Sequence, residues 1–271
     1  MLASDPGWVP PGVDPGQANV ARVYDYWLGG SHNFLADQDL GRAMAAVDPN
    51  VRAIARANRA FLGRAVRFLT AAGISQFLDI GSGIPTQGNV HEVAQRDDPA
   101  TRVLYAEIDP VAIAHSKAIL NGDRTAAIIE ADLREPDSIL AHPVTRRLID
   151  LDQPVGLLLV AVVHFLADAD DPRGLVAKLR DRLPSGSYLV LSHATSESRP
   201  EVTQAASTMY RSRAASKGRA RSRAEIGRLL DGFELVDPGL VYLPQWRPGP
   251  ADEMPADPSQ LWFLAGVGRK P

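Results

Sequence analysis

A glycine turn directly follows a short apolar run in the segment FLDIGSGIP, residues 77–85. The turn is built from Asp79, Gly81, Ser82 and Gly83, with one apolar residue between the aspartate and the first glycine. Glycine adopts positive φ readily and has no Cβ to keep a ligand away from the backbone. At the end of a strand this pattern is typical of a ligand-binding turn, although a G-x-G pair also occurs in ordinary tight turns.

An acidic residue ends the next apolar run, RVLYAEIDP, at Glu107. A carboxylate at the tip of the second strand can accept hydrogen bonds from both hydroxyls of a ribose. Asp109 stands directly before Pro110, an order that predicts a helix N-cap followed by the first helical residue. We therefore assign the ribose to Glu107 and capping to Asp109, and a solvated strand end remains the alternative for Glu107.

The third apolar run is followed by Asp132 and Leu133 in the segment EADL. An aspartate at a strand end can accept a hydrogen bond from an exocyclic amine, while a neighbouring backbone N–H donates to a ring nitrogen. We expect Asp132 and Leu133 to bind an adenine edge in this way. Together with the glycine turn and the predicted ribose contact, they indicate that the ligand is an adenosine derivative.

The form of the turn separates two classes of adenosine ligand. The dinucleotide fingerprint G-x-G-x-x-G needs a third glycine beneath the pyrophosphate, and that position is Thr86 here. The chain also lacks the Tyr-x-x-x-Lys pair of a short-chain dehydrogenase. S-adenosyl-L-methionine carries no phosphate, and a turn of the form Asp79-x-Gly81-x-Gly83 beside its amino-acid part favours it over NAD.

Histidines supply the candidate bases for methyl transfer. The reaction is an in-line displacement that mainly needs alignment and exclusion of water, and a base only where the acceptor loses a proton early. His164 follows the fourth apolar run, GLLLVAVV, so we expect it to face the reacting methyl group. A structural role is the alternative for His164, and we prefer that role for His193 and for His91. No pair of histidines has the spacing of a metal site, so we expect no metal.

An aromatic segment, YDYWLGGSHNF, precedes the α/β pattern in a chain that is only 6% aromatic. The segment could form a lid whose rings surround the sulfonium through cation–π contacts and close the acceptor pocket. Its candidate contacts with cofactor or substrate are Tyr24, Tyr26, His32 and Asn33. The alternative is that these rings anchor a helical addition on the sheet.

Short apolar runs alternate with helical segments from residue 76 onward, which is the signature of a parallel sheet with helices on both faces. The patterns before it predict a helix ending at the Gly29–Gly30 pair and one long amphipathic helix from about Val51 to Gly73. Two apolar runs near the C-terminus could pair as an antiparallel hairpin at one sheet edge. The predicted fold is a Rossmann-like, doubly wound α/β sheet with an N-terminal helical addition.

The predicted organisation is a flexible arm over residues 1–18, a helical lid or addition over 19–73 and a catalytic domain over 74–271. The net charge is −3 and there is no cysteine, so we expect neither a general polyanion binder nor a disulfide or thiolate metal site. No apolar run is long enough to cross a membrane, and the first residues lack the pattern of a secretory signal. These features predict a cytoplasmic protein that does not associate with membranes.

Four segments of the chain resemble a known family. They are ARVYDYWLGGSHNFLADQ, ANRAFLGRAVRFL, FLDIGSGIPTQGNVHEVA and GFELVDPGLVYLPQWRP. They are similar to an S-adenosylmethionine-dependent methyltransferase family, formerly a domain of unknown function and abundant in actinobacteria. The resemblance extends from about Val20 onward and implies a class I methyltransferase fold of seven strands, the last antiparallel.

The resemblance also implies which residues bind the cofactor: Gly81, Ser82, Gly83, Glu107, Asp132 and Leu133. The family usually has Asp where this chain has Glu107, whose longer side chain should still reach the ribose. The resemblance does not supply an acceptor.

The acceptor is the open part of the functional prediction. We expect a methyltransferase acting on a small molecule, and the alternatives are a non-catalytic S-adenosylmethionine sensor or an RNA methyltransferase. The stretch from Tyr210 to Arg228 is strongly basic, which would suit a phosphate backbone. It has one aromatic residue for base stacking and belongs to a net acidic chain, so we expect a solvated helical connection and no nucleic-acid partner. The sequence leaves the oligomeric state undetermined.

Overall fold

The structure is a computed structural model that describes residues 9–85, 88–214, 218–250, 252 and 254–271. The strands of its central sheet are β1 Gln76–Ile80, β2 Arg102–Glu107, β3 Ala126–Glu130, β4 Gly156–Val160, β5 Tyr188–Ala194, β6 Glu234–Leu235, β7 Val241–Tyr242 and β8 Phe263–Arg269.

The helices before β5 are α1 Val20–Leu28, α2 Leu35–Val47, α3 Val51–Ala71, α4 Val90–Ala94, α5 Pro110–Ile119, α6 Pro136–Ala141, α7 Pro143–Leu148, the 3₁₀ turns η1 Val163–Phe165 and η2 Asp168–Asp170, and α8 Pro172–Arg182. The helices after β5 are α9 Pro200–Arg213, α10 Arg223–Arg228, η3 Leu243–Gln245 and η4 Pro258–Leu261.

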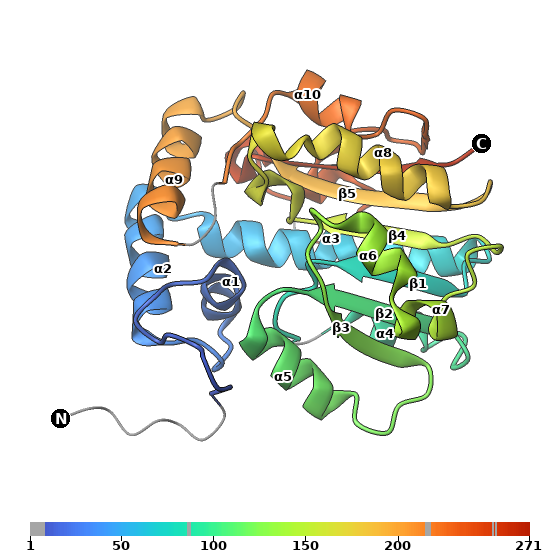
Figure 1. Ribbon diagram of the computed structural model, residues 1–271. Helices are drawn as coiled ribbons and strands as arrows, with labels where there is room; N and C mark the ends of the chain where they lie inside the picture. Colours follow the sequence, from blue (N-terminus) through green and yellow to red (C-terminus); the bar gives the residue numbers. More distant parts are fainter. Residues whose placement is uncertain (1–8, 86–87, 215–217, 251, 253) are drawn as a thin grey trace.

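The sheet is doubly wound, as predicted. Its strand order is β3-β2-β1-β4-β5-β8-β6, and β7 also pairs with β8. Strands β1 to β5 are mutually parallel, whereas β8 runs antiparallel to β5 in the register Tyr188 to Arg269 (Figure 1). The chain runs outward from β1 to β3 and then returns to place β4 on the other side of β1. Ligands bind at such a switch point, beyond the carboxyl ends of the strands.

Residue alternation along the strands separates two hydrophobic cores. In β1, Phe77 belongs to the core shared with α1 to α5 and α9, while Leu78 and Ile80 belong to the core shared with α6, α7, α8 and α10. Strands β1 to β5 and β8 are largely buried on both faces, which explains why their sequences read as continuous apolar runs. The two cores fix the direction of every strand tip and therefore the position of the residues that follow it.

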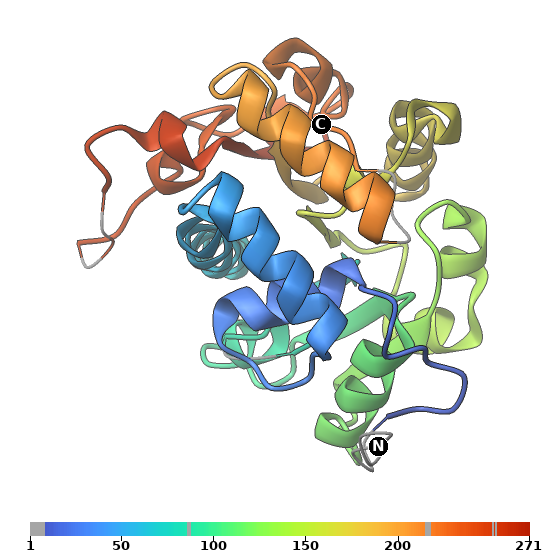
Figure 2. The same cartoon turned by 90° about the vertical axis from the view of Figure 1, so that its left-hand side faces the viewer.

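The N-terminal helices lie over the carboxyl ends of the strands. In Figures 1 and 2, α1, α2 and α9 pack together at this end of the sheet, while α3 runs from the cluster along one face. As predicted, α1 ends at Gly29, whose φ is +83°, and α3 spans the long amphipathic pattern. A buried ion pair joins Arg22 to Asp37 at 3.3 Å and fixes α1 against α2.

Two details of the sheet differ from the sequence-based expectation. The C-terminal hairpin partner is divided into β6 and β7 by the turn at Pro238–Gly239, so the described residues contain eight strands where the family pattern implies seven. The fourth strand ends at Val160, earlier than the apolar run suggests. Ala161 has a left-handed φ of +54°, and its N–H bonds to Ser192 on β5, so the chain leaves the sheet there.

None of the helices in the described ranges is long and apolar enough to span a membrane.

Candidate functional site

A cavity of about 580 Å³ lies at the switch point of the sheet. Its floor consists of the tips of β1 to β4, and the residues that follow η1 close one side. The other walls come from α1, α3 and α9, together with residues 218–220 and 262–263. The cavity is within the size range of small-molecule sites and brings the predicted strand-tip residues together in one place.

The glycine turn forms one wall of this cavity, and both of its glycines are required there. Gly81 has φ of +74°, and an added Cβ would lie 2.4 Å from Cγ2 of Val162. Gly83 has φ of +68°, and a Cβ there would meet nothing within 4 Å. The backbone at Gly83 is therefore open to a ligand. Between them, Ser82 lines the cavity, and its hydroxyl is buried without a hydrogen-bond partner among the described residues.

Glu107 ties the glycine turn to the second strand tip. Its Oε2 accepts a hydrogen bond from the Gly83 N–H at 2.7 Å, and its Oε1 accepts from the N–H groups of Ile108 and Asp109. Burial raises the pKa of this carboxyl, and the three N–H groups oppose that shift. Asp109 caps α5 by accepting from the Ala112 N–H at 2.9 Å, as predicted. Glu107 is thus held rigidly at the cavity wall, with lone pairs left for a ligand.

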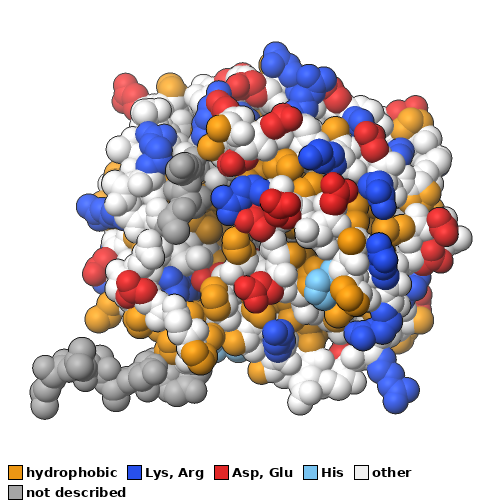
Figure 3. Space-filling view, in the orientation of Figure 1, with side chains coloured by type: hydrophobic (Ala, Val, Ile, Leu, Met, Phe, Trp, Pro, Cys, Tyr) orange, Lys and Arg blue, Asp and Glu red, His pale blue; other side chains and the backbone are white. Residues whose placement is uncertain are grey.

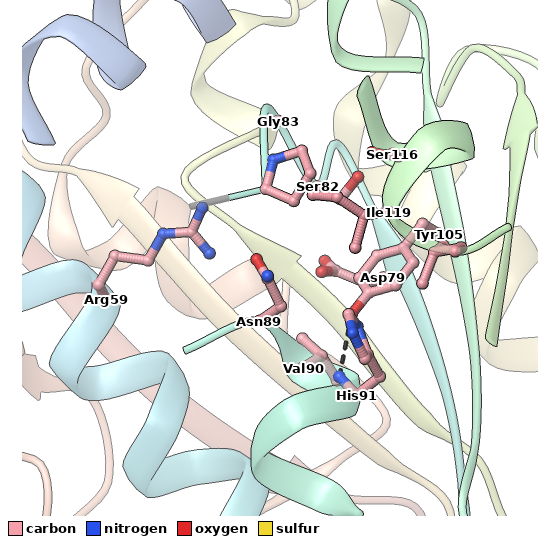
Figure 4. A pocket seen from close by; sticks show the side chains of 12 residues that line it. Arg59, Asp79, Ser82, Gly83, Asn89, Val90, His91, Tyr105, Ser116 and Ile119 are labelled. Carbon is pink, nitrogen blue, oxygen red and sulfur yellow. Dashed lines mark hydrogen bonds between the residues drawn. The ribbon is translucent and has the colours of Figure 1, made fainter. Parts of the chain in front are cut away.

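Asp79 and Arg59 form a second charged group beside the turn, where a small side pocket opens behind Ser82 and Gly83 (Figure 4). Burial raises the pKa of Asp79 to about 7; the Arg59 charge lowers it and the Glu107 charge raises it. Nε of Arg59 is buried and lacks a hydrogen-bond partner among the described residues. These two opposite charges face a site that can hold a zwitterion.

The predicted adenine contacts, Asp132 and Leu133, also line the cavity. Leu133 is buried, while the Asp132 carboxylate is bound by Arg134 through Nε at 3.0 and 2.9 Å and through Nη2. The Arg134 hydrogen bonds also lower the pKa of Asp132, although burial opposes them. A ligand amine at this position would have to share the carboxylate with Arg134, which the sequence did not indicate.

A polar network crosses the end of the cavity beneath α1. Tyr24 on α1 donates a hydrogen bond to the Ala55 carbonyl at 3.0 Å and accepts one from Asn58 Nδ2 at 3.0 Å. Oδ1 of Asn58 accepts from the Ser192 hydroxyl at 2.6 Å. Burial raises the pKa of Tyr24, so its hydroxyl stays protonated at neutral pH. The network fixes α1 and α3 against β5 at the cavity.

The sequence analysis did not identify Asn58 or Arg59 as site residues, although the position of Asn58 could have indicated a site. Asn58 stands between Ile54 and Leu62 at four-residue spacing, on the buried face of an amphipathic helix. A polar side chain in such a row needs a buried partner, which is a reason to suspect a site. Arg59 has no comparable signal, since arginines are common in this helix.

His164 lines the cavity, and it lies in the turn η1 rather than at a strand end. Its ring is 7% exposed and packs against Phe165 and Phe263 at centroid distances of 4.0 and 5.2 Å. Nδ1 is buried without a hydrogen-bond partner among the described residues. Burial first, and then the charges of His193 and Arg221, lower the pKa of His164 well below its ordinary value. The ring is therefore neutral at physiological pH.

The two other candidate histidines have structural partners outside the large cavity. His193 is fully buried; Nδ1 is 2.8 Å from the Ala194 carbonyl and Nε2 is 3.0 Å from Arg221 Nη1. Because the guanidinium can only donate, Nε2 accepts and Nδ1 carries the proton. His91 bonds to the Tyr105 hydroxyl at 2.7 Å and faces the side pocket.

The predicted lid residues divide into two groups. Tyr24 lines the cavity, whereas Tyr26, His32 and Asn33 are absent from its described lining. Tyr26 lies under Arg52 at 5.3 Å, the His32 ring is 3.7 Å from that of His115, and Asn33 Nδ2 donates to Asp25 at 2.8 Å. Tyr26 and Asn33 therefore make contacts within the N-terminal helical segment, and His32 packs this segment against His115 of α5.

The composition of the basic stretch predicted a solvated helical connection, but part of the stretch is buried. Arg221 is 5% exposed, and its guanidinium bonds to the carbonyls of Val163 and Leu166 and to Asp168. It therefore holds the loop that carries His164. Lys217 lies outside the described residues. On the face shown in Figure 3, basic and acidic side chains are interspersed and do not form a single basic surface.

No group of three or more His, Cys, Asp or Glu side chains suited to a metal ion occurs in the part of the chain that the structure describes.

Comparison with known proteins gives consistent results. A family model described as S-adenosyl methyltransferase matches residues 6–271. Two solved structures are similar over nearly the whole chain. An inferred methyltransferase of Thermobifida fusca is 42% identical with a TM-score of 0.91, covering 97% of this chain and 98% of its own. A DUF574 family protein of Streptomyces avermitilis is 40% identical with a TM-score of 0.91, covering 95% and 99%. None of the curated proteins matches.

Proposed function

Because this chain belongs to the S-adenosyl methyltransferase family and uses S-adenosyl-L-methionine as its cofactor, we propose that its methyl acceptor is a small molecule bound in the same cavity. The observation that carries the proposal is the continuity of the cavity. One lining surface runs from the glycine turn and Glu107 to a chamber beneath α1, α3 and α9. A chamber walled by helices on the far side suits a compact acceptor better than a polymer.

Each residue at a strand tip is proposed to bind a different part of the cofactor. Glu107 accepts from the ribose hydroxyls, and Asp132 with the Leu133 backbone reads the adenine. Asp79 pairs with the ammonium group of the methionine part, and Arg59 with its carboxylate. The buried Ser82 hydroxyl and the unpartnered Arg59 Nε support this fit, since each lacks a partner that a polar ligand would supply.

The residues around the acceptor chamber serve alignment. The cofactor supplies a methyl group on a positively charged sulfur. Tyr24 and Asn58 present a neutral, rigid polar edge where that charge would lie, and the Tyr24 ring can face it by a cation–π contact. The neutral imidazole of His164 can accept a hydrogen bond from the substrate that receives the methyl group. Apolar walls from α3, α9 and β8 exclude water, which favours a displacement reaction.

Turnover of methyl-labelled S-adenosyl-L-methionine against a metabolite extract, with and without nuclease and protease, tests this proposal. We expect label in small molecules, unaffected by nuclease or protease treatment. Label in nucleic acid or protein would contradict the small-molecule acceptor.

A variant of the proposed ribose partner tests the cofactor contacts. Glu107→Gln should weaken S-adenosylhomocysteine binding by about 1–3 kcal/mol, because it leaves buried polar groups imperfectly paired. Glu130→Gln changes an exposed carboxylate at the neighbouring strand tip, outside the described lining of the cavity, and is the matched control. Unchanged affinity in Glu107→Gln would indicate that Asp109, and not Glu107, binds the ribose.

A further inference from the structure

We infer that the acceptor is a hydroxylated aromatic compound with a second, carbonyl-type oxygen, and that the hydroxyl oxygen receives the methyl group. This inference rests on the proposed small-molecule function and adds the class of substrate. Three features of the chamber carry it: the rings in its walls, the placement of its charges, and two polar atoms left without partners.

Aromatic side chains from four separate parts of the chain converge on the chamber. They come from α1, from η1, from α9 and from the start of β8 with the residue before it. The six rings are Tyr24, Trp27, Phe165, Tyr210, Trp262 and Phe263. Such walls favour a flat apolar acceptor, because aromatic rings pack face to edge and offset against one another.

The acidic residues of the cavity come from the strand tips and from η2. Asp79 lies in β1 and Glu107 ends β2, whereas Asp109 and Asp132 follow β2 and β3, and Asp170 lies in η2. The described lining residues contributed by α1, α3, α9, 218–220 and 262–263 include no acidic residue. A cationic amine would therefore find no carboxylate counter-ion at this end, whereas a hydroxyl needs none.

His164 offers an acceptor for one hydrogen bond. The ring lines the chamber, and its Nδ1 lacks a partner within the described residues. Because burial and the nearby charges keep the imidazole neutral, one ring nitrogen is free to accept. An O–H group on the acceptor would satisfy it.

Arg219 offers a donor beside it. Its Nε lies 3.2 Å from Asp168 and its Nη2 lies 2.9 Å from Glu225, which leaves Nη1 buried and without a partner in the described residues. The backbone N–H of Arg219 donates a hydrogen bond to the backbone carbonyl of His164 at 2.7 Å, so the two residues are joined at the chamber wall. The two carboxylates already balance the charges of Arg219 and Arg221, and the free Nη1 suits a ketone or a carboxylate oxygen alike.

The reaction balances with these groups. The hydroxyl oxygen of the acceptor forms a bond to the methyl carbon while the carbon–sulfur bond breaks and its electron pair stays on sulfur. The hydroxyl proton passes toward His164 and then to solvent. The products are a methyl ether, S-adenosylhomocysteine and one proton.

Binding of simple probes to the protein loaded with S-adenosylhomocysteine tests the inference by calorimetry. The probes are 2-hydroxybenzoate and 2-hydroxyacetophenone, with phenol lacking the second oxygen and benzylamine carrying a cation. We expect both two-oxygen probes to bind at least roughly tenfold more tightly than phenol, with benzylamine weakest. Mass spectrometry should find the methyl ether of a two-oxygen probe after incubation with S-adenosyl-L-methionine.

Arg219→Gln should reduce the affinity of the two-oxygen probes to that of phenol, and Arg219→Lys should restore part of it. Arg211→Gln removes an exposed charge from α9 and should change nothing. The inference fails if benzylamine binds best, if neither two-oxygen probe binds, or if Arg219→Gln binds them as well as the unaltered protein. Retained S-adenosylhomocysteine binding in that variant shows that it is folded, and small-molecule labelling in the extract would leave the proposed function standing.

Discussion

The individual side chains of this site are charged at one end of the cavity and neutral at the other end. Asp79, Arg59 and Glu107 are grouped around the glycine turn, where burial removes the water that would otherwise solvate them. Burying charge in this way is costly unless partners are present, so the charged end is prepared for a ligand that brings opposite charges. At the other end, Tyr24 and His164 are both held neutral by burial.

Asp79 should make cofactor binding depend on pH. Its pKa is raised to about 7, so in the free protein the carboxyl holds a proton below that pH. Pairing with an ammonium group requires the ionised form. The affinity for S-adenosylhomocysteine should therefore be full above about pH 7 and fall by up to about tenfold for each pH unit below it.

Calorimetry between pH 6 and 8 checks this expectation. In Asp79→Asn the affinity should be low and should lose this pH dependence. Arg59→Met should also weaken binding, whereas Arg56→Met, an exposed position on the same helix, should not. A wild-type affinity that does not change over this range would show that Asp79 does not pair with the ammonium group.

His164 should act with a neutral ring over the whole physiological range. Because its pKa is lowered, turnover should not show a rise centred at pH 6.5 from this residue. His164→Ala should lower kcat by roughly 10²- to 10⁴-fold if the ring takes the proton. His164→Gln keeps a hydrogen-bond acceptor but cannot serve as a base.

Steady-state kinetics of these two variants separates the two roles, with S-adenosylhomocysteine affinity as the check on folding. A Gln variant as slow as the Ala variant supports proton transfer to the ring. Restored activity in the Gln variant would show that the histidine only positions the acceptor.

At the scale of elements, α1 has two faces with different roles. Tyr24 and Trp27 line the cavity, while Val23 is fully buried in the core and Arg22 pairs with Asp37 on α2. The same helix therefore closes the site and holds the helical addition together. A helix that is also part of a core cannot open as a free flap, so access to the chamber must involve a different segment or a movement of several helices together.

Deletion of residues 1–30 tests the importance of α1. We expect it to abolish turnover and weaken S-adenosylhomocysteine binding, because it removes Tyr24 and the wall of the chamber. Circular dichroism should still report the sheet, with a lower Tm from the loss of buried Val23 and Trp27. Loss of all secondary structure would assign the segment a purely structural role. Unchanged turnover would contradict its place in the site.

For the whole molecule, the decisive feature is a single switch point between β1 and β4 beneath a layer of helices. The cofactor contacts proposed here come from the tips of parallel strands, from α3 and from Tyr24 on α1. The proposed acceptor walls come from the helices above the strand tips, from η1 and from residues 262–263. Binding therefore joins the two hydrophobic cores and the helical layer through one ligand. A ligand that contacts so many elements in the folded state should stabilise the entire protein.

The thermal stability of the protein should report cofactor identity. S-adenosylhomocysteine at about 100 times its Kd should add about 2.7 kcal/mol to the free energy of unfolding and raise Tm measurably. NAD at the same concentration should not, since the turn lacks the glycine that a pyrophosphate needs. Scanning calorimetry with each ligand checks this, and a larger shift with NAD would reverse the assignment made from the glycine turn.

The sequence by itself determined the sheet, the glycine turn and the acidic strand tips, because continuous apolar runs and glycine positions depend on local geometry and burial. It also predicted a position near the strand tips for His164, from its place after the fourth run. Only the tertiary structure decided that Asn58 and Arg59 line the cavity, that Tyr26, His32 and Asn33 lie outside its described lining, and that Arg221 is buried. These outcomes depend on how α1, α3 and the 218–221 segment pack over the strand tips. Contacts between residues far apart in the chain are set by packing, which no local pattern encodes.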